Sequence, residues 1–435
     1  MDGFSYEIMD EEVLHEPVEE RVVSSMQDNT EVLRDEQNFI RSVSQFYNSE
    51  ALSDVEIRIC DQKFHSHRFV LATLSDVFRT MLYDENWTQS KERTIVLKES
   101  EICQVVFDHF LKFFYTAEIT VTLETAVGIL CLADKYNVAS LKSLCMGYMV
   151  KHSKSPQVQN ALSWYSWAKA LNLPELINQC TKTISWNIRA VLNSDEWVSM
   201  DSDFVYDILS NSELVILNEF FLYEALVKWL YIESNYENLQ DNATRLLPLI
   251  RFPQMMVWHL NYIEKNDLIQ KEECKEILKE LVSKAYRFRS LCMSQALLGV
   301  SFQDKFYLPR NYLELAVDAV RMQNTHRFAF QVDVETYAGP VPSETREGNW
   351  KITYHKNPDS CNWSLQFYCY EMATIKGEAL VQASILIFNH ANKVIQLEMV
   401  DSYDCTKSRH LAITVSINNP DDSKLMVVLI KPVPH

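Results

Sequence analysis

Residues 67–81 read His67-Arg68-Phe69-Val70-Leu71-Ala72-Thr73-Leu74-Ser75-Asp76-Val77-Phe78-Arg79-Thr80-Met81, and this stretch decides the fold of the first module. Its apolar residues recur at helical spacing as far as Leu82, which predicts helix. Immediately before it, residues 54–60 alternate between polar and apolar with period two, Asp61-Gln62 supply a turn, and residues 63–65 start back. This pattern is typical of a β-hairpin.

The residues that follow complete one α+β module. Residues 94–97 have the composition of a short strand, and apolar residues at helical spacing occur at 107–114 and again from 123 to 149. Strands followed by packed helices predict a compact α+β unit over residues 34–150. The preceding residues 1–33 are rich in Asp and Glu and show no sustained apolar period, so we expect a disordered acidic tail there.

A helix at the start of the module carries an apolar stripe that needs a partner surface. Phe39, Ile40, Val43, Phe46 and Tyr47 fall at spacings of one, four, seven and eight residues, which places them on one helical face. Two coverings fit this pattern: a second copy of the chain, or another part of the same chain that acts as a lid. The pattern by itself leaves both open.

The spacing H-R-x-x-L-A-x-x-S-x-x-F-x-x-M within residues 67–81, preceded by Ser53-Asp54-Val55, resembles that of the BTB/POZ domain. The resemblance continues through residues 113–119 and 132–138, so it covers roughly residues 34–150. It implies the α+β fold of that family and leads us to expect a homodimer.

In that family the first helix packs against its copy in a second chain. Burial of several large apolar side chains, at about 1.5 to 3 kcal/mol each, makes such a dimer persistent. Asp54 and Arg68 match a buried charged pair near the family's interface, and removal of one partner of such a pair leaves the other uncompensated. The dimer-interface residues that the resemblance implies are Phe39, Ile40, Val43, Phe46, Asp54 and Arg68.

The resemblance also implies recruitment of cullin-3, the scaffold of a ubiquitin ligase, through a hydrophobic-x-Glu motif. The corresponding residues here are Trp87-Thr88-Gln89, so the charge of the glutamate is lost while an acceptor oxygen is kept. The alternative is that these are ordinary surface and core residues of the fold. The cullin-binding positions that we carry over are Met81, Leu82, Tyr83, Trp87, Gln89 and Tyr136.

Residues 151–295 predict an all-α array with no convincing strand. Pro156, Pro174, Pro248 and Pro253 stand where helices would begin or end. The region is similar to the BACK domain, which follows the BTB/POZ domain in many adaptors, although an unrelated helical bundle is the plain alternative. The marks of the resemblance include Asn160-Ala161, Trp167-Ala168, Leu171, Leu173, Leu176, Cys180, Leu209, Leu214, Asn218-Glu219, Ala225, Trp229 and Arg251-Phe252-Pro253.

In residues 300–435 the helical spacing of apolar residues gives way to short apolar runs separated by turn residues. Seven strands in so short a span predict an antiparallel β-sandwich. Fragments around Trp350, Ser364 and Val381 resemble a TRAF/MATH-type sandwich, which implies binding of a client protein, with 367–370 and 379–388 as candidate walls of a peptide groove. The predicted strands are 328–334, 350–354, 364–370, 379–388, 394–400, 410–417 and 424–430.

Composition excludes several classes of function. The formal charge of −18 opposes nucleic-acid binding. Only seven glycines occur in 435 residues and none are close together, which excludes a P-loop, a dinucleotide-binding fingerprint and glycine-rich kelch repeats. No apolar run is long enough for a membrane span, and no signal-peptide pattern opens the sequence. We therefore expect no membrane association and a cytoplasmic location, with the nucleus as an alternative.

The sequence also shows no group of residues typical of a catalytic or metal-binding site. Ten cysteines without regular spacing are typical of reduced, mostly buried thiols. His65 and His67 near Cys60 provide two ligands on a short strand without a third, so we expect no metal site and no cofactor. We find no arrangement of nucleophile, base and orienting group.

The function that we expect is that of a non-enzymatic homodimeric adaptor. In the first hypothesis it is a substrate-recognition subunit of a cullin-3 RING ubiquitin ligase, with residues 300–435 binding an unidentified client. The alternative hypothesis is a scaffold or assembly protein that uses the same dimer without a ligase.

Overall fold

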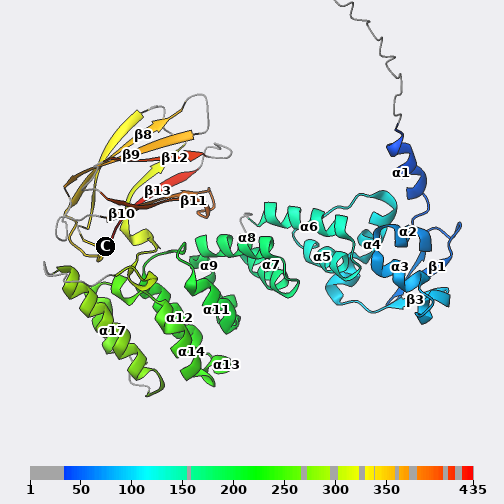
Figure 1. The fold of residues 1–435 in the computed structure, drawn as a ribbon, viewed down its shortest axis with the longest axis horizontal. Helices are drawn as coiled ribbons and strands as arrows, with labels where there is room; N and C mark the ends of the chain where they lie inside the picture. The colour runs from blue at the N-terminus through cyan, green and yellow to red at the C-terminus, as the bar shows by residue number, and fades with distance from the viewer. Residues whose placement is uncertain are drawn as a thin grey trace, which may run out of the picture.

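The structure is a computed structural model. It describes residues 34–153, 158–265, 272–293, 302–322, 329–337, 339–357, 362–371, 380–404, 410–416 and 424–434. An α+β part, a helical part and a β-sandwich follow one another along the chain, with the sandwich resting on the far end of the helical part (Figure 1). The predicted acidic tail and Pro156 lie outside the described residues.

The α+β part contains a three-stranded sheet in the order β2-β1-β3. The predicted hairpin is confirmed, since β1 (Val55–Ile59) and β2 (Gln62–Ser66) pair antiparallel. Its turn is one residue earlier than predicted, because Gln62 already pairs with Ile59 and Cys60 adopts the positive φ of 50° that a tight hairpin turn requires. β3 (Thr94–Leu97) joins the other side of β1 in the parallel direction.

The stretch that decided the fold forms two helices, α2 (Arg68–Leu74) and α3 (Asp76–Tyr83), with Ser75 between them. The backbone of Ser75 is extended, and its side-chain oxygen accepts a hydrogen bond of 3.0 Å from the backbone N–H of Phe78. Its hydroxyl donates to the carbonyl oxygen of Tyr136. Serine is a favoured N-cap, so α3 begins here with a new axis while the apolar spacing continues in the sequence.

Three longer helices complete the α+β part. α4 (Glu101–Thr116) is the central one, and Phe107, Phe110 and Leu111 are completely buried in the core. It ends at Ala117, which has a left-handed φ of 54°. The following helices are α5 (Ala126–Lys135) and α6 (Ala139–His152).

The helical part forms as predicted over most of its length. Pro174 occupies the first turn of α8, and Pro248 and Pro253 lie in short 3-10 turns, where a missing amide donor is tolerated. Its elements are α7 (Val158–Ala170), α8 (Pro174–Trp186), α9 (Ile188–Leu192), α10 (Asp195–Ser199), α11 (Ser202–Ser210), α12 (Glu219–Leu230), α13 (Glu233–Tyr236), α14 (Leu239–Leu246), η2 (Leu247–Leu249), η3 (Phe252–Gln254), α15 (Val257–Glu264) and α17 (Glu272–Met293).

The C-terminal part consists of two four-stranded sheets, β11-β10-β13-β6 and β12-β9-β8-β7. Alternate residues of the strands, such as Ile352, Leu365 and Ile385, are fully buried between the sheets. All seven predicted strands are present and an eighth, β6, was missed. The strands are β6 (Ala316–Arg321), β7 (Ala329–Thr336), β8 (Gly348–Lys356), β9 (Asn362–Glu371), β10 (Leu380–Phe388), β11 (Val394–Asp404), β12 (His410–Ser416) and β13 (Leu425–Val433).

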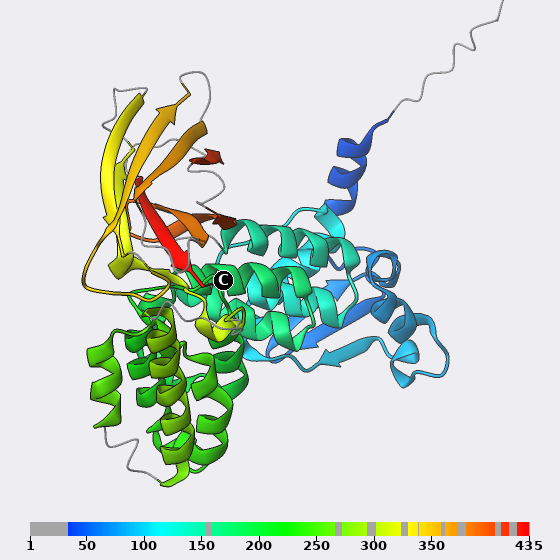
Figure 2. The ribbon, with the colours of Figure 1, turned by 60° about the vertical axis from the view of Figure 1, so that its left-hand side comes forward.

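The outer face of one sheet of the sandwich is covered by the helical part. Leu386 and Phe388 of β10 are buried in an apolar cluster with Val215, and Trp186 packs against it. The side chain of Asn187 bonds both backbone groups of Val394. Figure 2 shows this sheet facing the green helices. The sheet β12-β9-β8-β7 lies on the opposite side of the sandwich.

A short parallel strand pair also joins the two parts. β4 (Val215–Ile216) pairs with β5 (Asn311–Tyr312) across 96 positions of sequence. The expectation of no strand between residues 155 and 295 is therefore wrong at this point. A strand of two residues is too short for period-two alternation to be visible, and its partner lies in another part of the chain.

Candidate dimerisation and partner-binding surfaces

The apolar stripe of α1 (Glu36–Ser44) is only partly covered by its own chain. Phe39 is 71% exposed and Ile40 38%, whereas Val43 and Phe46 are half-buried against the α+β core. The first turns of α1 stand away from the body of the molecule (Figure 2). Phe39 therefore needs a covering that the described part of this chain does not supply.

A groove of about 710 Å³ runs alongside α1. Its walls include Phe69 and Leu74 of α2, and its floor includes Phe114 and Tyr115 at the end of α4. Phe69 is 73% exposed, and Leu52, at the rim, is 81% exposed. The sequence analysis did not predict either residue. Phe69 could have been found, because α2 has apolar residues on two sides and only the side with Leu71 faces the core.

The base of α1 is anchored to the core by hydrogen bonds. The hydroxyl of Tyr47 donates to the carboxylate of Asp108 on α4, and burial, followed by this contact, raises the pKa of Tyr47. The ring of His67 lies between the hydroxyl of Tyr115 at 3.0 Å and the carbonyl oxygen of Ala51 at 2.9 Å. These contacts hold one end of the groove while the tip of α1 remains exposed.

Asp54 and Arg68 do not form the buried ion pair that the resemblance implied. Asp54 is exposed, and its carboxylate accepts a hydrogen bond of 2.8 Å from the backbone N–H of Arg68. The guanidinium of Arg68 instead donates to the carbonyl oxygens of Leu82, Ser90 and Glu92. The prediction of a charged pair is wrong within one chain, because three backbone carbonyls occupy the guanidinium. Arg68 thus fastens the segment that follows α3.

The residues predicted to bind cullin-3 lie at the end of α3, in the segment that follows it and, for Tyr136, at the end of α5. Tyr83, at the end of α3, is 54% exposed, Trp87 is 48% exposed, and Met81 is half-buried. Leu82 and Tyr136 are each only 2% exposed, so neither presents a side chain to a partner in this structure. For these two, the assignment as contact residues is corrected: they belong to the core beneath the surface.

Tyr136 supports the partner-binding surface from below. Its ring stacks on Phe78 of α3, with centroids 4.5 Å apart and an interplanar angle of 12°. Its hydroxyl donates to the carboxylate of Glu99, and burial, followed by this hydrogen bond, raises the pKa of Tyr136. α3 therefore lies on a fixed aromatic base.

Gln89 is in the 3-10 turn η1 (Thr88–Lys91) and is half-buried. Its side-chain oxygen is buried without a hydrogen-bond partner. The acceptor role expected for Gln89 thus requires the side chain to rotate outward. A buried unpaired amide oxygen carries a desolvation penalty of about 1–3 kcal/mol, which favours such a rotation once a donor is offered.

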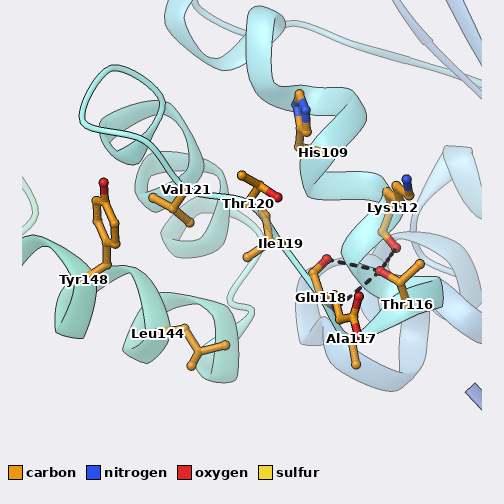
Figure 3. A pocket seen from close by; sticks show the side chains of 10 residues that line it. All are labelled: His109, Lys112, Thr116, Ala117, Glu118, Ile119, Thr120, Val121, Leu144 and Tyr148. Atoms are coloured by element: carbon orange, nitrogen blue, oxygen red, sulfur yellow. Dashed lines mark hydrogen bonds between the residues drawn. The ribbon is translucent and has the colours of Figure 1, made fainter. Parts of the chain in front are cut away.

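A second hollow of about 750 Å³ lies on the far side of Ala117, between α4, the 116–121 segment and α6. Figure 3 shows His109 and Lys112 on one side and Leu144 and Tyr148 on the other. The hydrogen bonds drawn there, from Thr116 to the carbonyls of Lys112 and Glu118, complete the turn after α4. This hollow is a mixed polar and apolar surface beside the groove along α1.

On the sandwich, the residues suggested as groove walls divide between core and surface. Phe367 is buried, and residues 384–388 of β10 are buried on both faces because the helical part covers the outer one. Tyr368 and Tyr370 project from the outer face of β9, with ring centroids 5.0 Å apart. Lys351 of β8 lies over the ring of Tyr370 at 5.4 Å. β10 is therefore wrong as a groove wall.

Two further features of the described residues concern metals and membranes. No three His, Cys, Asp or Glu side chains among them lie close enough to hold a metal ion. In the same residues, no helix combines the length and the apolarity that crossing a membrane requires.

Comparison with protein families agrees with the first two parts of the chain. The family model described as BTB/POZ domain matches residues 43–153. The model described as BTB And C-terminal Kelch, or BACK, matches residues 161–265. The α+β part and the helical part of the structure are therefore a BTB/POZ domain and a BACK domain, as the sequence predicted.

The chain is also a distant homologue of several curated proteins. BTB/POZ domain-containing protein 17 of Mus musculus is 29% identical over 293 residues, which make up 67% of this chain and 59% of that protein. The Homo sapiens protein of the same name is 28% identical over 307 residues, 70% of this chain and 61% of its own length. Kelch-like protein 7 of Rattus norvegicus is 27% identical over 246 residues, 56% of this chain and 40% of that protein. The matches thus span less than two thirds of these relatives.

Proposed function

Because the chain contains a BTB/POZ domain followed by a BACK domain, the arrangement of a family of protein-interaction adaptors, we propose that it acts as a homodimeric adaptor that binds proteins and catalyses no reaction. The observation that carries the proposal is the apolar groove beside α1, with Phe39, Leu52 and Phe69 exposed around it. A second copy, whose own α1 presents the same stripe, is the covering that we propose.

The energetics favour a stable pair. Each large apolar side chain that becomes fully buried contributes about 1.5 to 3 kcal/mol, and a twofold interface buries each residue twice. Three such residues on each chain therefore give a contribution of roughly 9 to 18 kcal/mol before the entropic cost of association, which is estimated at about 4 to 15 kcal/mol. A dimer at micromolar concentration is consistent with this balance.

Sedimentation equilibrium of the full chain at micromolar concentration tests the dimer. We expect twice the chain mass of 50.8 kDa for the wild type and a single-chain mass for the double variant Phe39→Glu, Phe69→Glu. Val105→Glu is the matched control, because Val105 is 76% exposed on α4 away from the groove, and this variant should remain dimeric. A single-chain mass for the wild type would refute the proposal.

We further propose that the dimer recruits cullin-3 and so acts as a substrate-recognition subunit of a RING ubiquitin ligase. Tyr83 and Trp87 support this, since both are exposed aromatic residues between Leu82 and Ser90, whose carbonyl oxygens accept hydrogen bonds from Arg68. Met81 and Gln89 flank them. We keep these four as the candidate contact residues.

Co-purification of cullin-3 with the full chain tests recruitment. We expect recovery with the wild type and a strong loss with Tyr83→Ala, Trp87→Ala. The matched control is Trp258→Ala, Tyr262→Ala, which removes a tryptophan and a tyrosine that are 54% and 53% exposed on α15 of the BACK domain. Equal recovery from both double variants, or none from the wild type, would refute recruitment at this surface.

The client is proposed to bind the C-terminal sandwich through the sheet β12-β9-β8-β7. The outer face of the other sheet packs on the BACK domain, so we place the client on the opposite sheet, around Lys351, Tyr368 and Tyr370. Proximity labelling with the full chain, compared between wild type and Tyr368→Ala, Tyr370→Ala, tests this. The isolated residues 300–435 are less suitable, because their release would expose Leu386 and Phe388.

A scaffold that dimerises without a ligase is the second candidate function. The inward side chain of Gln89, where the motif of the family has glutamate, favours it. A labelling survey in which wild type and Tyr83→Ala, Trp87→Ala both return the same partners and no ubiquitin machinery would support this candidate over the ligase subunit.

A further inference from the structure

Two cysteines of the BTB/POZ domain lie at a close contact between α4 and α5. Cys103 is in the first turn of α4, and Cys131 is in the middle of α5. Between these helices, Gly128 lies so near Ile102 that a Cβ on Gly128 would be 2.3 Å from the carbonyl oxygen of Ile102. The two backbones therefore almost touch beside the cysteines. A disulfide needs Cα atoms about 4.4–6.8 Å apart, so two helices must pack closely for one to form between them.

The sulfur of Cys103 contacts the backbone of α5 close to Cys131. The thiol of Cys103 donates to the carbonyl oxygen of Gly128, one turn before Cys131, at 3.8 Å. The Cys131 side chain is also near enough to Cys103 for each thiol to perturb the pKa of the other. Both cysteines are free in this structure. The two thiols thus lie together at the contact between α4 and α5.

The surroundings divide the chemical roles between the two thiols. The pKa of Cys103 is lowered to about 6, chiefly by the hydrogen bond from Cys131 and further by Ser100 and the ammonium of Lys135, against the opposing effect of burial and of Glu99. The first turn of a helix also favours a thiolate through its free amides. The pKa of Cys131 is raised, so that this residue keeps its proton. Cys103 is thereby the nucleophile and Cys131 the partner thiol.

We propose that Cys103 and Cys131 are a redox pair that forms an intramolecular disulfide when the protein meets a peroxide. The Cys103 thiolate attacks one oxygen of hydrogen peroxide and becomes a sulfenic acid, while hydroxide leaves. The sulfur of Cys131 then attacks the sulfenic sulfur, its proton leaves with the hydroxyl group as water, and the S–S bond forms. Two thiols and one peroxide give one disulfide and two waters, and a dithiol reductant reverses the change.

The two thiols differ from another buried thiol of the same domain. Cys131 is half-buried, and Cys103 is 5% exposed. Cys145 of α6 is fully buried, and burial raises its pKa to about 12. The raised pKa keeps the Cys145 thiol protonated and unreactive at neutral pH, whereas the lowered pKa of Cys103 favours its thiolate.

Peptide mapping of the full-length protein tests the proposal. Folded protein is treated with hydrogen peroxide, free thiols are blocked with iodoacetamide, and tryptic peptides are analysed without reduction. Cleavage after Lys98, Lys112 and Lys135 places Cys103 and Cys131 in the separate peptides 99–112 and 113–135. We expect these peptides to be joined, with a mass 2 Da below their sum, and to separate on reduction. Peptides that stay separate and fully alkylated would overturn the proposal.

Variants and a pH series give independent readouts. Cys131→Ser should leave a Cys103 sulfenic acid that dimedone captures, and Cys103→Ser should abolish both products, while Cys145→Ser should form the link as the wild type does. In Cys131→Ala, which removes the donor, half-maximal dimedone capture should shift to higher pH than in Cys131→Ser. A linked peptide that survives in Cys103→Ser, or equal capture at Cys145, would contradict the assignment even if one variant folds poorly.

Discussion

Nη1 of Arg310 donates to both carboxylate oxygens of Glu219, at 2.8 and 2.9 Å, and both side chains are almost completely buried. Glu219 begins α12 of the BACK domain, whereas Arg310 directly precedes β5 at the start of the C-terminal part. The hydroxyl of Tyr312 and the backbone N–H of Arg251 donate to the same carboxylate, at 2.9 and 3.1 Å. A buried ionic centre therefore holds the junction between the BACK domain and the sandwich.

Breaking this pair should strongly destabilise the protein. Glu219→Gln or Arg310→Met leaves one buried charge without its partner, which costs about 3–5 kcal/mol in unfolding free energy. The double variant should lower the unfolding free energy by less than the sum of the two single changes, because neither charge then remains. Urea unfolding followed by tryptophan fluorescence measures all three.

Arg245→Met is the matched control for that cycle. Arg245 pairs with Asp203 at 2.7 Å, but the side chains are 41% and 71% exposed. An exposed pair contributes about 0–1 kcal/mol, so this variant should be close to wild type. An equal decrease in unfolding free energy for Arg245→Met and Arg310→Met would show that the buried ion pair stabilises the protein no more than an exposed pair does.

A buried lysine at the same junction should make stability depend on pH. Lys431 of β13 is fully buried and donates to Oδ1 of Asn311 at 3.0 Å. Burial, and next the charge of Arg251, lowers its pKa from 10.5 to about 7. Between pH 7 and 8.5 the unfolded chain keeps this proton while the folded chain releases it, so the unfolding free energy rises with pH, by about 1–2 kcal/mol over this range.

The comparison of variants isolates this effect from other titrating groups. Above about pH 9, buried thiols and tyrosines whose pKa values are raised, such as Cys180 and Tyr354, act in the opposite direction. Urea unfolding at pH 7.0, 7.5, 8.0 and 8.5 should show a steeper rise for wild type than for Lys431→Met. Replacing the exposed Lys112 with Met should leave the slope unchanged. Parallel curves for wild type and Lys431→Met would contradict the assignment.

The junction also shows where sequence reasoning ends. Period-two alternation and Pro positions are local signals, and they predicted the β1–β2 hairpin, the helix start at Pro174 and the seven strands of the sandwich. Glu219 and Arg310 are 91 residues apart, and Lys431 and Asn311 are 120 apart. No local pattern distinguishes these side chains from surface charges, because their pairing arises only when two domains pack.

The partner-binding residues illustrate a second limit. A motif gives the position of a residue but not its exposure, so Leu82 and Tyr136 were carried over although both are buried. The stripe of α1 was visible because one helical face was apolar. Phe69 was not recognised because α2 has apolar residues toward the core as well, and the pattern does not tell which side the chain itself covers.

Replacing Arg68 should loosen the segment after α3 and leave the proposed dimer intact. Its guanidinium bonds three carbonyls on Leu82, Ser90 and Glu92, so Arg68→Met leaves these without donors and should loosen the 88–92 turn. We expect faster amide hydrogen exchange at residues 88–92 and an unchanged dimer mass. Asp54→Asn is the matched control, because its amide oxygen can still accept from the backbone N–H of Arg68. Equal exchange in both variants would contradict this role.

Two glycines in neighbouring helices should respond oppositely to the same substitution. Gly128→Ala in α5 would place a Cβ 2.3 Å from the carbonyl oxygen of Ile102 and 2.9 Å from Val106, so the α4–α5 contact must open, which we expect to destabilise the domain by about 2–4 kcal/mol. A Cβ on Gly147 in α6 would meet nothing within 4 Å, and removing glycine from a helix stabilises by about 0.5–1 kcal/mol. Thermal unfolding of both variants measures the difference. A neutral Gly128→Ala would mean that the helices do not approach this closely, and the disulfide between Cys103 and Cys131 would then lose its geometric basis.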